Sequence, residues 1–549
     1  MSFCCKTLAA CAAFLAASTL TPTVDAQSSS RWKTITPEEI DGDLRFLSSD
    51  LLEGRAPASR GGQLATEYIA DQLRSAGVEP GVGDSYFQKV PIDVVTIDSS
   101  SIAVRASGKA NATLHQSDDV VVWAGSAVPE SKARGELVFV GYGATAPEYD
   151  WDDFKGVDVK GKVLLVLVND PPAPASEPKL FGGKAMTYYG RWTYKFEEAE
   201  RRGAAGMLVI HTTEEASYPW HTVVSSWATP QYMLPRDAKL PPPLGFRGWI
   251  TNDAAGKLLA SAGLDLKELR KQAQSRDFHP VSTGIMIDAS FRNGVRRMES
   301  RNVVGVVKGK GSLSDEYVAY SAHWDHFGIG PKVNGDSIYN GAVDNASGTA
   351  ALLAVARAAA AAPKPRRSQI FVFVTAEEAG LLGSSYFANN PTVPASKIIA
   401  DLNMDVVTLE GRVKDLTVLG ENKSSLGPML AHFISRDGMR ISPDDHPEAG
   451  HFYRSDHFSF AKAGIPAISV GAGVDYVGRP KGWGQQRGDD YTAHRYHQPS
   501  DEYSPDFDLG GAAQIATIVQ RFGATLANSP VKPTWNKDAE FKAVSDDGK

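Results

Sequence analysis

The C-terminal half of the chain alternates short apolar segments with segments of helix-like composition. An alanine-rich stretch at residues 348–362 is closed by Pro363 and Pro365, because proline cannot continue a helix. Parallel strands need a crossover connection, usually a helix, so this alternation predicts an α/β domain with a doubly wound, mostly parallel sheet. The expected strands are residues 302–307, 316–321, 369–375, 398–404 and 467–470.

Two folded units are expected, because 549 residues exceed the size of one ordinary domain. Between residues 120 and 295 the pattern changes to short strands separated by turns rich in proline and glycine, which predicts a β-rich insert. The main domain is then divided into residues 27–119 and 296–530. The polar tail at 531–549 is expected to be loosely ordered.

The N-terminus predicts a signal peptide, residues 1–26. Lys6 precedes an apolar run, and Val24-Asp25-Ala26 resembles a signal-peptidase site, so cleavage is expected near Ala26. The run is too short for a permanent membrane span, and no later segment has about 18 uninterrupted apolar residues. A lipoprotein acylation site ending at Cys11 is the alternative, which the short apolar region before it disfavours. We therefore expect a secreted or periplasmic protein without a stable membrane span.

Composition narrows the possible functions. The formal net charge of −7 argues against nucleic acid as a partner, because proteins that bind it usually carry a basic patch. All three cysteines lie within the predicted signal peptide, so the mature protein is expected to contain none. A metal site in the mature chain would then be made from His, Asp and Glu side chains.

Side chains of the metal-ligand type stand where the expected strands end. An open α/β sheet builds its sites from side chains collected at the carboxyl ends of its strands. Taken singly, each has an ordinary structural explanation, such as a helix cap at Asp344, an acidic turn at Glu377-Glu378 or a surface position for His497. Together they predict a metal site. The set is His323, Asp325, Asp344, Glu377, Glu378, Asp405 and His497.

The spacing within this set indicates a division of roles. His323 could bind a metal while Asp325, two residues further on, orients its ring through the other nitrogen. Glu377 and Glu378 would repel each other at the end of a buried strand unless positive charge lies nearby. With a metal present, one of the two carboxylates binds the ion while the other accepts a proton from a bound water.

The ordered motifs H-x-D, G-A-x-D-N-A-S-G, E-E, N-x-D and Y-H-x-P-x-D resemble those of the secreted two-zinc aminopeptidases, relatives of bacterial leucyl aminopeptidase and of glutamate carboxypeptidase. The resemblance covers roughly residues 30–115 and 296–525. Within the insert, Gly161-Lys162-Val163 and the run G-A-A-G-M-L-V-I resemble the protease-associated domain, with an unrelated β-rich insert as the alternative. The resemblance implies the zinc exopeptidase fold with a protease-associated domain inserted into it.

The resemblance also implies which residues hold two zinc ions. His323 and Asp405 would hold one ion, and Glu378 and His497 the other. Asp344 would bridge the two ions. A glycosylation sequon begins at the residue after Asp344, and a sugar there would obstruct the site, so a bacterial envelope setting is favoured over a eukaryotic secretory one.

Four further roles follow from the resemblance. Glu377 would be the general base, and Asp325 the carboxylate that supports the ring of His323. Tyr496 would donate a hydrogen bond to the oxyanion. His457 would be a residue of the substrate pocket rather than a ligand.

The implied function is that of a zinc-dependent exopeptidase acting on peptides, and specifically an aminopeptidase that uses a water shared by two zinc ions. A carboxypeptidase or dipeptidase of the same fold is the first alternative, in which Arg454 or Arg487 would bind a terminal carboxylate. A glutaminyl cyclotransferase uses one zinc ion, which the complete five-ligand set disfavours. A scaffold without catalytic activity is disfavoured for the same reason, because none of the ligands is missing.

Overall fold

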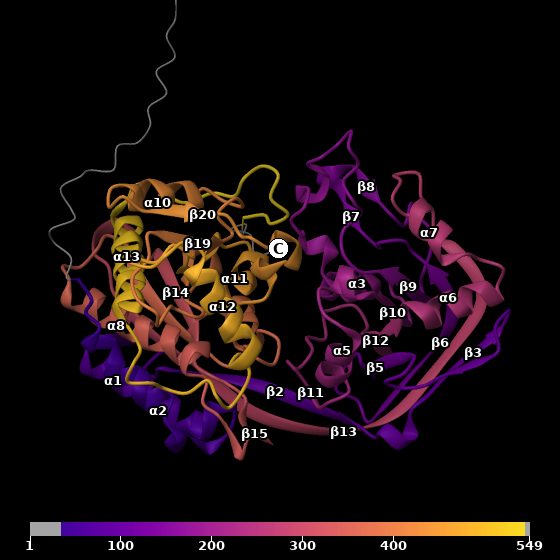
Figure 1. The fold of residues 1–549 in the computed structure, drawn as a ribbon, viewed down its shortest axis with the longest axis horizontal. Helices are drawn as coiled ribbons and strands as arrows, with labels where there is room; N and C mark the ends of the chain where they lie inside the picture. Colours follow the sequence, from indigo (N-terminus) through magenta and orange to yellow (C-terminus); the bar gives the residue numbers. More distant parts are fainter. Residues whose placement is uncertain (1–33, 544–549) are drawn as a thin grey trace, which may run out of the picture.

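The computed structural model describes residues 34–543 and shows two lobes joined by one long strand (Figure 1). This strand, β13 (Val281–Val307), belongs to both sheets of the molecule. Its first half pairs with β3 and β6 in one lobe, and its second half pairs with β2 and β17 in the other. The two sheets are therefore continuous through β13, and no loop separates the lobes at this point. The signal peptide expected at residues 1–26 lies outside the described residues.

The main sheet confirms the α/β fold class predicted from the alternating strands and helices. Its centre is the parallel series β17–β14–β18–β21, and antiparallel pairs flank that centre on both sides. The order is β11 (Gln231–Met233), β2 (Phe87–Ile97), β13, β17 (Ser368–Val374), β14 (Tyr317–His323), β18 (Ile398–Asn403), β21 (Ala467–Ala472), β19 (Asp415–Leu419) and β20 (Arg440–Ser442). The short strand β1 (Glu79–Pro80) also pairs with β13.

Helices cover both faces of this sheet, as doubly wound folds require. Successive residues of β14 alternate between the two layers: Val318 and Tyr320 pack into one core, and Ala319 into the other. The first layer contains α1 (Glu38–Leu47), α2 (Arg60–Ser75), α8 (Ser347–Ala361), α10 (Leu426–Ser435) and α13 (Gly510–Asn528). The second layer contains α9 (Leu382–Asn389) and α11 (His457–Lys462).

Helix α8 is buried along nearly its whole length, because its alanine-rich sequence is apolar on every side. The helix predicted at residues 348–362 is thus confirmed within one residue at each end. In α2 the Leu64 side chain is 40% exposed. The buried face of the helix runs through Ala65, Ile69 and Leu73, which the helical repeat places on one side.

The second lobe is built on a mixed sheet. Its order is β4 (Ala112–Leu114), β3 (Ala103–Gly108), β13, β6 (Glu130–Phe139), β9 (Val163–Leu167), β10 (Gly206–His211), β12 (Phe246–Thr251) and β5 (Val120–Ala124). Helices α6 (Asn252–Ser261) and α7 (Leu266–Gln272) pack on one face, and α3 (Trp192–Arg201) and α5 (Trp220–Trp227) on the other. The domain limits expected at residues 120 and 295 fall inside this arrangement, because β3 already pairs within the second sheet and β13 runs through residue 295.

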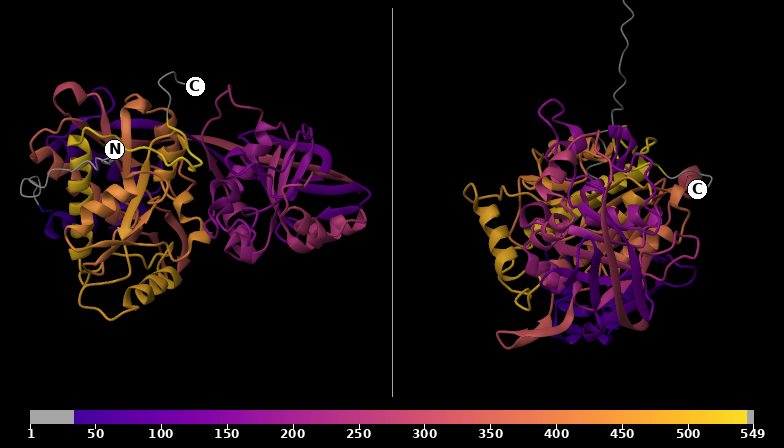
Figure 2. Two further views of the ribbon diagram at one scale, coloured as in Figure 1. Left: turned by 90° about the horizontal axis from the view of Figure 1, so that it is seen from above. Right: turned by 90° about the vertical axis from the view of Figure 1, so that its right-hand side faces the viewer.

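The lobes also touch each other away from β13, as the side-by-side arrangement in Figure 2 indicates. The Met186 amide of the second lobe donates to the Pro447 carbonyl of the main lobe over 3.0 Å. Lys462 of α11 donates to the Tyr188 hydroxyl over 3.0 Å and pairs with Glu197 of α3. Within residues 34–543, no helix has both the length and the hydropathy needed to cross a membrane.

Candidate metal centre

The carboxyl ends of three neighbouring parallel strands carry predicted ligands. β14 ends on His323, while Glu377 follows β17 and Asp405 follows β18. Because β14 pairs in parallel with both β17 and β18, the three ends open at the same edge of the sheet. The structure therefore brings these side chains together as the sequence predicted.

Asp344 reaches the same edge from the turn that precedes α8. The neighbouring Asn345 is completely buried, and its side-chain oxygen accepts from the amides of Gly348 (2.9 Å) and Val406 (3.1 Å). A Cβ at position 348 would lie 2.5 Å from the Met404 carbonyl, so only glycine allows α8 to approach the end of β18 this closely. These contacts fix Asp344 beside Asp405.

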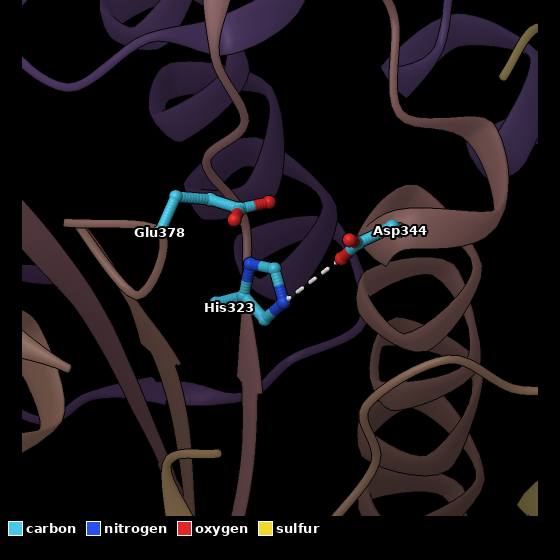
Figure 3. Close-up of side chains that lie close together, drawn as sticks. All are labelled: His323, Asp344 and Glu378. Atoms are coloured by element: carbon cyan, nitrogen blue, oxygen red, sulfur yellow. Dashed lines mark ion pairs between the residues drawn. The ribbon is translucent and has the colours of Figure 1, made fainter. Parts of the chain in front are cut away.

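The carboxylate of Asp344 lies between the two predicted histidine ligands. One oxygen, Oδ1, is 3.4 Å from His323 Nε2, and the other, Oδ2, is 3.3 Å from His497 Nε2. Figure 3 shows the side chains of His323, Asp344 and Glu378 converging from separate elements. A further carboxylate stands beside each histidine: Asp405 Oδ1 is 3.2 Å from His323 Nε2, and Glu378 Oε2 is 3.3 Å from His497 Nε2.

These residues fit metal ions. Two groups have donor atoms within 4.8 Å of one another, namely His323, Asp344 and Glu378, and His323, Glu377 and Asp405. His497 Nε2 is buried and faces two carboxylate oxygens without a hydrogen bond to any described residue, as a nitrogen directed at an ion would. Imidazole and carboxylate donors of this kind suit zinc.

The electrostatics of the centre also favour a cation. Burial raises the pKa of Glu377 and of Glu378 well above the usual value, and the neighbouring carboxylates of Asp405 and Asp344 raise it further. Burial would lower the pKa of His323, but Asp405 and Glu377 outweigh it and hold this pKa well above the usual value. So many buried carboxyl groups can ionise together only when positive charge lies among them.

Asp325 connects two of the strand ends. Its Oδ1 accepts from the Glu377 amide over 3.2 Å, which ties the end of β17 to the end of β14. The sequence predicted that its carboxylate orients the His323 ring, but the nearest acceptor of His323 Nδ1 is the Asp325 backbone carbonyl at 3.2 Å. The Asp325 carboxylate oxygen lies 4.0 Å from His323 Nδ1. Asp325 therefore supports the ring mainly through its own backbone carbonyl, while its carboxylate holds the Glu377 amide.

His326 is a residue of the centre that the sequence analysis missed. Its ring is buried, and Nδ1 lies 2.6 Å from Glu378 Oε1. Burial lowers the pKa of His326 to about 3, so the ring is neutral and donates from Nδ1 to the carboxylate. The signal available in the sequence was a second histidine three positions after His323, in the run H-W-D-H.

Asp501 supports the turn that carries Asp344. Its carboxylate accepts from the amides of Val343 and Asp344, each over 3.0 Å, and from the Tyr491 hydroxyl over 3.2 Å. The sequence analysis included Asp501 in the motif Y-H-x-P-x-D without giving it a role. These bonds hold the backbone at Asp344. The motif that contains Asp501 therefore supports the turn that carries Asp344.

Tyr496 and Phe327 flank the exposed side of His497. The Tyr496 ring stacks on the His497 ring with centroids 3.7 Å apart and an interplanar angle of 27°. Phe327 packs against the same imidazole at 4.7 Å and 66°. Since Tyr496 is 43% exposed and Phe327 42% exposed, this pair lies at the mouth of the site.

The structure buries His457, the residue that the sequence predicted to line the substrate pocket. The side chain has no exposed surface, stands at the start of α11 and packs on Phe452 with ring centroids 4.8 Å apart. Burial lowers its pKa to about 3, so the ring is neutral. The neighbouring Asp456 is also completely buried, and its carboxyl group lies close enough to His323 and Asp405 for their charges to interact.

Comparison with known proteins agrees with this geometry. Residues 302–522 match the model of peptidase family M28. The match contains His323, Asp344, Glu378, Asp405 and His497, and over this segment the chain is similar to a family of peptidases, as the motifs predicted.

Curated relatives match parts of the chain at low identity. Leupeptin-inactivating enzyme 1 of Streptomyces exfoliatus is 28% identical over 205 residues, which are 36% of this chain and 45% of that protein. Probable glutamate carboxypeptidase AMP1 of Arabidopsis thaliana is 26% identical over 377 residues, 63% of this chain and 49% of that protein. Leucine aminopeptidase 2 of Trichophyton rubrum is 24% identical over 308 residues, 52% of this chain and 59% of that protein. The chain thus spans about half the length of the curated relatives it matches.

A solved structure of similar extent is the aminopeptidase from Aneurinibacillus sp. strain AM-1. It is 19% identical, with a TM-score of 0.47, and the match covers 93% of this chain and 98% of that one.

Proposed function

We propose that this chain is a zinc-dependent exopeptidase, and specifically an aminopeptidase that releases N-terminal residues of peptides. The observation that carries the proposal is the position of Asp344, whose two oxygens lie 3.4 and 3.3 Å from the Nε2 atoms of His323 and His497. Each histidine has its own additional carboxylate, Asp405 or Glu378. One shared and two separate carboxylates with two imidazoles form the donor set that a pair of zinc ions requires.

The ligand roles follow from these distances. His323 and Asp405 would hold one zinc ion, Glu378 and His497 would hold the second, and Asp344 would bridge them. When bound, the two ions lower the pKa of a shared water towards about 7 and polarise the carbonyl that is attacked.

Glu377 is the general base in this proposal. Its carboxylate makes no hydrogen bond or ion pair with another described residue, although its own amide is held by Asp325. Burial raises its pKa well above the usual value, so it can accept a proton from the attacking water and pass it to the leaving amine. Tyr496, at the mouth of the site, donates a hydrogen bond to the oxyanion.

The test is a substrate panel applied to the zinc-loaded protein. Aminoacyl-nitroanilides with a free α-amine are compared with the same compounds blocked at the amine and with N-blocked peptides. We expect turnover only when the α-amine is free. Turnover confined to blocked substrates would contradict the aminopeptidase assignment while leaving the metal centre intact.

A second candidate, a carboxypeptidase or dipeptidase, is favoured by one observation. The guanidinium groups of Arg191, which precedes α3, and of Arg454 lie close together, and among the described residues neither pairs with a carboxylate. Burial and the nearby Arg454 lower the pKa of Arg191 to about 10. Arg454 stands two positions before Asp456, whose carboxyl group lies close enough to His323 for the two charges to interact. Two unpaired cations beside the centre would suit the free carboxylate of a peptide C-terminus.

The substrate panel also tests this candidate. If a terminal carboxylate is bound there, Arg454→Gln raises KM for N-blocked peptides with a free C-terminus and leaves the aminoacyl-nitroanilides unaffected. An equal effect on both kinds of substrate would remove the support that the two arginines give to the carboxypeptidase reading.

Secretion and the identity of the insert complete the proposal. A signal peptide cleaved near Ala26 would export the chain to the bacterial envelope or the medium, where peptides are available as substrates. The second lobe would be a protease-associated domain that contacts α11 of the main lobe through Tyr188. Mass spectrometry of the exported protein tests the cleavage site, which predicts Gln27 as the first residue.

A further inference from the structure

Arg55 is a buried arginine whose side chain bonds only to backbone carbonyls. Its side chain is 1% exposed, and among the described residues it forms no ion pair with a carboxylate. Nε donates to the Trp324 carbonyl over 2.8 Å, and Nη1 to the carbonyls of Leu47 and Asn340, each over 2.5 Å. Nη2 donates to the Gly341 carbonyl over 3.0 Å. Burying a charge of this kind costs free energy, and the hydrogen bonds to the four carbonyls offset part of that cost.

The carbonyls that Arg55 binds belong to the two turns that carry the metal ligands. Trp324 follows His323, and Gly341 begins the turn that leads to Asp344. The backbone carbonyl of Arg55 also accepts from the His326 amide over 3.4 Å. One residue of the N-terminal segment therefore holds both turns, although they come from separate parts of the chain.

The backbone around Arg55 adopts an unfavourable conformation. Glu53, Gly54 and Arg55 have φ values of 50°, 67° and 52°, in the left-handed region that side chains with a Cβ seldom occupy. A Cβ at Gly54 would lie 2.4 Å from the Tyr339 carbonyl, so this segment is pressed against the hairpin of β15 (Gly328–Val333) and β16 (Asp336–Tyr339). Strained residues of this kind persist where the surrounding structure fixes them, and they concentrate at functional sites.

The charge of Arg55 lies near several buried carboxylates of the centre. Burial lowers the pKa of Arg55 to about 10, and the carboxylates of Asp325, Asp501 and Asp344 act against that shift, so the guanidinium stays charged at neutral pH. It is thus a permanent cation beside a group of buried carboxylates. It lies outside the segment, residues 302–522, that matches the peptidase family.

We infer that Arg55 is a positioning residue of the metal centre: by bonding the turns at Trp324 and Gly341 it sets the separation of His323 and Asp344, so that both reach the same ion. This inference rests on the proposed zinc centre. The guanidinium is suited to the task because its planar fork presents donors in several fixed directions at once, which the single ammonium of lysine cannot do.

The experiment compares Arg55→Lys with Arg367→Lys. Arg367 is the matched control because it is also 1% exposed, donates to the Leu526 carbonyl over 3.1 Å and pairs with Glu316 at 2.7 Å, away from the predicted ligands. Zinc affinity is measured by competition with a chelator, and Tm is measured with and without zinc. We expect Arg55→Lys to lose about 10–100-fold in zinc affinity, the usual effect of residues that support metal ligands, and to lose most of the rise in Tm on adding zinc. Arg367→Lys is expected to lower Tm and keep the affinity for zinc.

Kinetics of the zinc-saturated variants give a second readout. A positioning role predicts a lower kcat for Arg55→Lys with KM little changed, because zinc-saturated Arg55→Lys would still hold His323 and Asp344 at the wrong separation. If Arg55→Lys does not fold without zinc, the zinc concentration that restores its folded state is measured instead. We expect Arg55→Lys to need a higher zinc concentration for refolding than an Arg367 variant that also fails to fold without zinc. Equal zinc affinity in the two variants would contradict the inference, whereas a wild-type protein that binds no zinc would first overturn the proposed function.

Discussion

Glu378 presents its two carboxylate oxygens to two different histidines. Oε1 lies 2.6 Å from His326 Nδ1, and Oε2 lies 3.3 Å from His497 Nε2. The hydrogen bond from His326 therefore fixes the orientation in which the other oxygen faces the site. Ligating carboxylates in metalloproteins are commonly held by such a bond from a second side chain.

Replacing His326 should weaken the binding of the second zinc ion. His326→Ala removes the donor to Glu378 Oε1, so the carboxylate can rotate, and we expect zinc affinity at this position to fall about 10–100-fold. Titration with a chelator measures the two ions separately. His446→Ala is the control, because His446 is exposed and pairs only with Glu448 at 3.2 Å. Unchanged binding of the second ion in His326→Ala would show that Glu378 needs no such support.

Substitutions of the two adjacent glutamates should differ in their effect on zinc content. Glu377→Gln keeps the shape of the side chain but cannot accept a proton, so we expect kcat to fall about 10²–10⁴-fold while the zinc content stays that of the wild type. Glu378→Gln removes a ligand, so we expect zinc to be lost together with activity. Metal analysis of both purified variants beside their kinetics makes the comparison. Full activity in Glu377→Gln would refute its assignment as the base.

Removing the metal should make stability depend on pH with a definite sign. In the folded apoprotein the pKa values of Glu377 and Glu378 are raised by burial above 4.5, and that of His323 is raised above 6.5 by Asp405 and Glu377. Above about pH 6.5 the buried rings of His326 and His457 are neutral in both states, and the folded state binds more protons than the unfolded state, so its free energy of unfolding falls as pH rises through neutrality. Denaturant titrations of the chelated protein at about pH 7, 7.5 and 8 test this.

Zinc should reverse that trend. Ligands bind metal only in their deprotonated form, so zinc affinity rises with pH and the holoprotein should gain stability over the same range. An apoprotein whose free energy of unfolding increases between about pH 7 and 8 would contradict the raised pKa values of Glu377, Glu378 and His323.

Much of the site could be predicted because parallel strands end at one edge. His323 and Asp405 were located by the apolar segments before them, since the end of a buried strand is visible in the sequence. The turn of Asp344 was recognised by its small residues. Its position between two histidines was not, because this depends on contacts such as the one between Asn345 and Val406, distant in sequence.

Other residues carry no local signal. Arg55 acts through backbone carbonyls more than two hundred residues away, and no spacing pattern in the sequence marks such a contact. The complete burial of His457 also could not be predicted, since a motif fixes a residue's position in the chain but not the face of the helix on which its side chain lies.

The central claim, two ions bridged by Asp344, is tested most directly by counting zinc. The fully active protein should contain two zinc ions per chain, and Asp344→Asn, which cannot bridge two cations as a carboxylate does, should retain at most one. Metal analysis by mass spectrometry on the same samples used for the activity assay gives the answer. One zinc ion per chain in fully active wild-type protein would contradict the account.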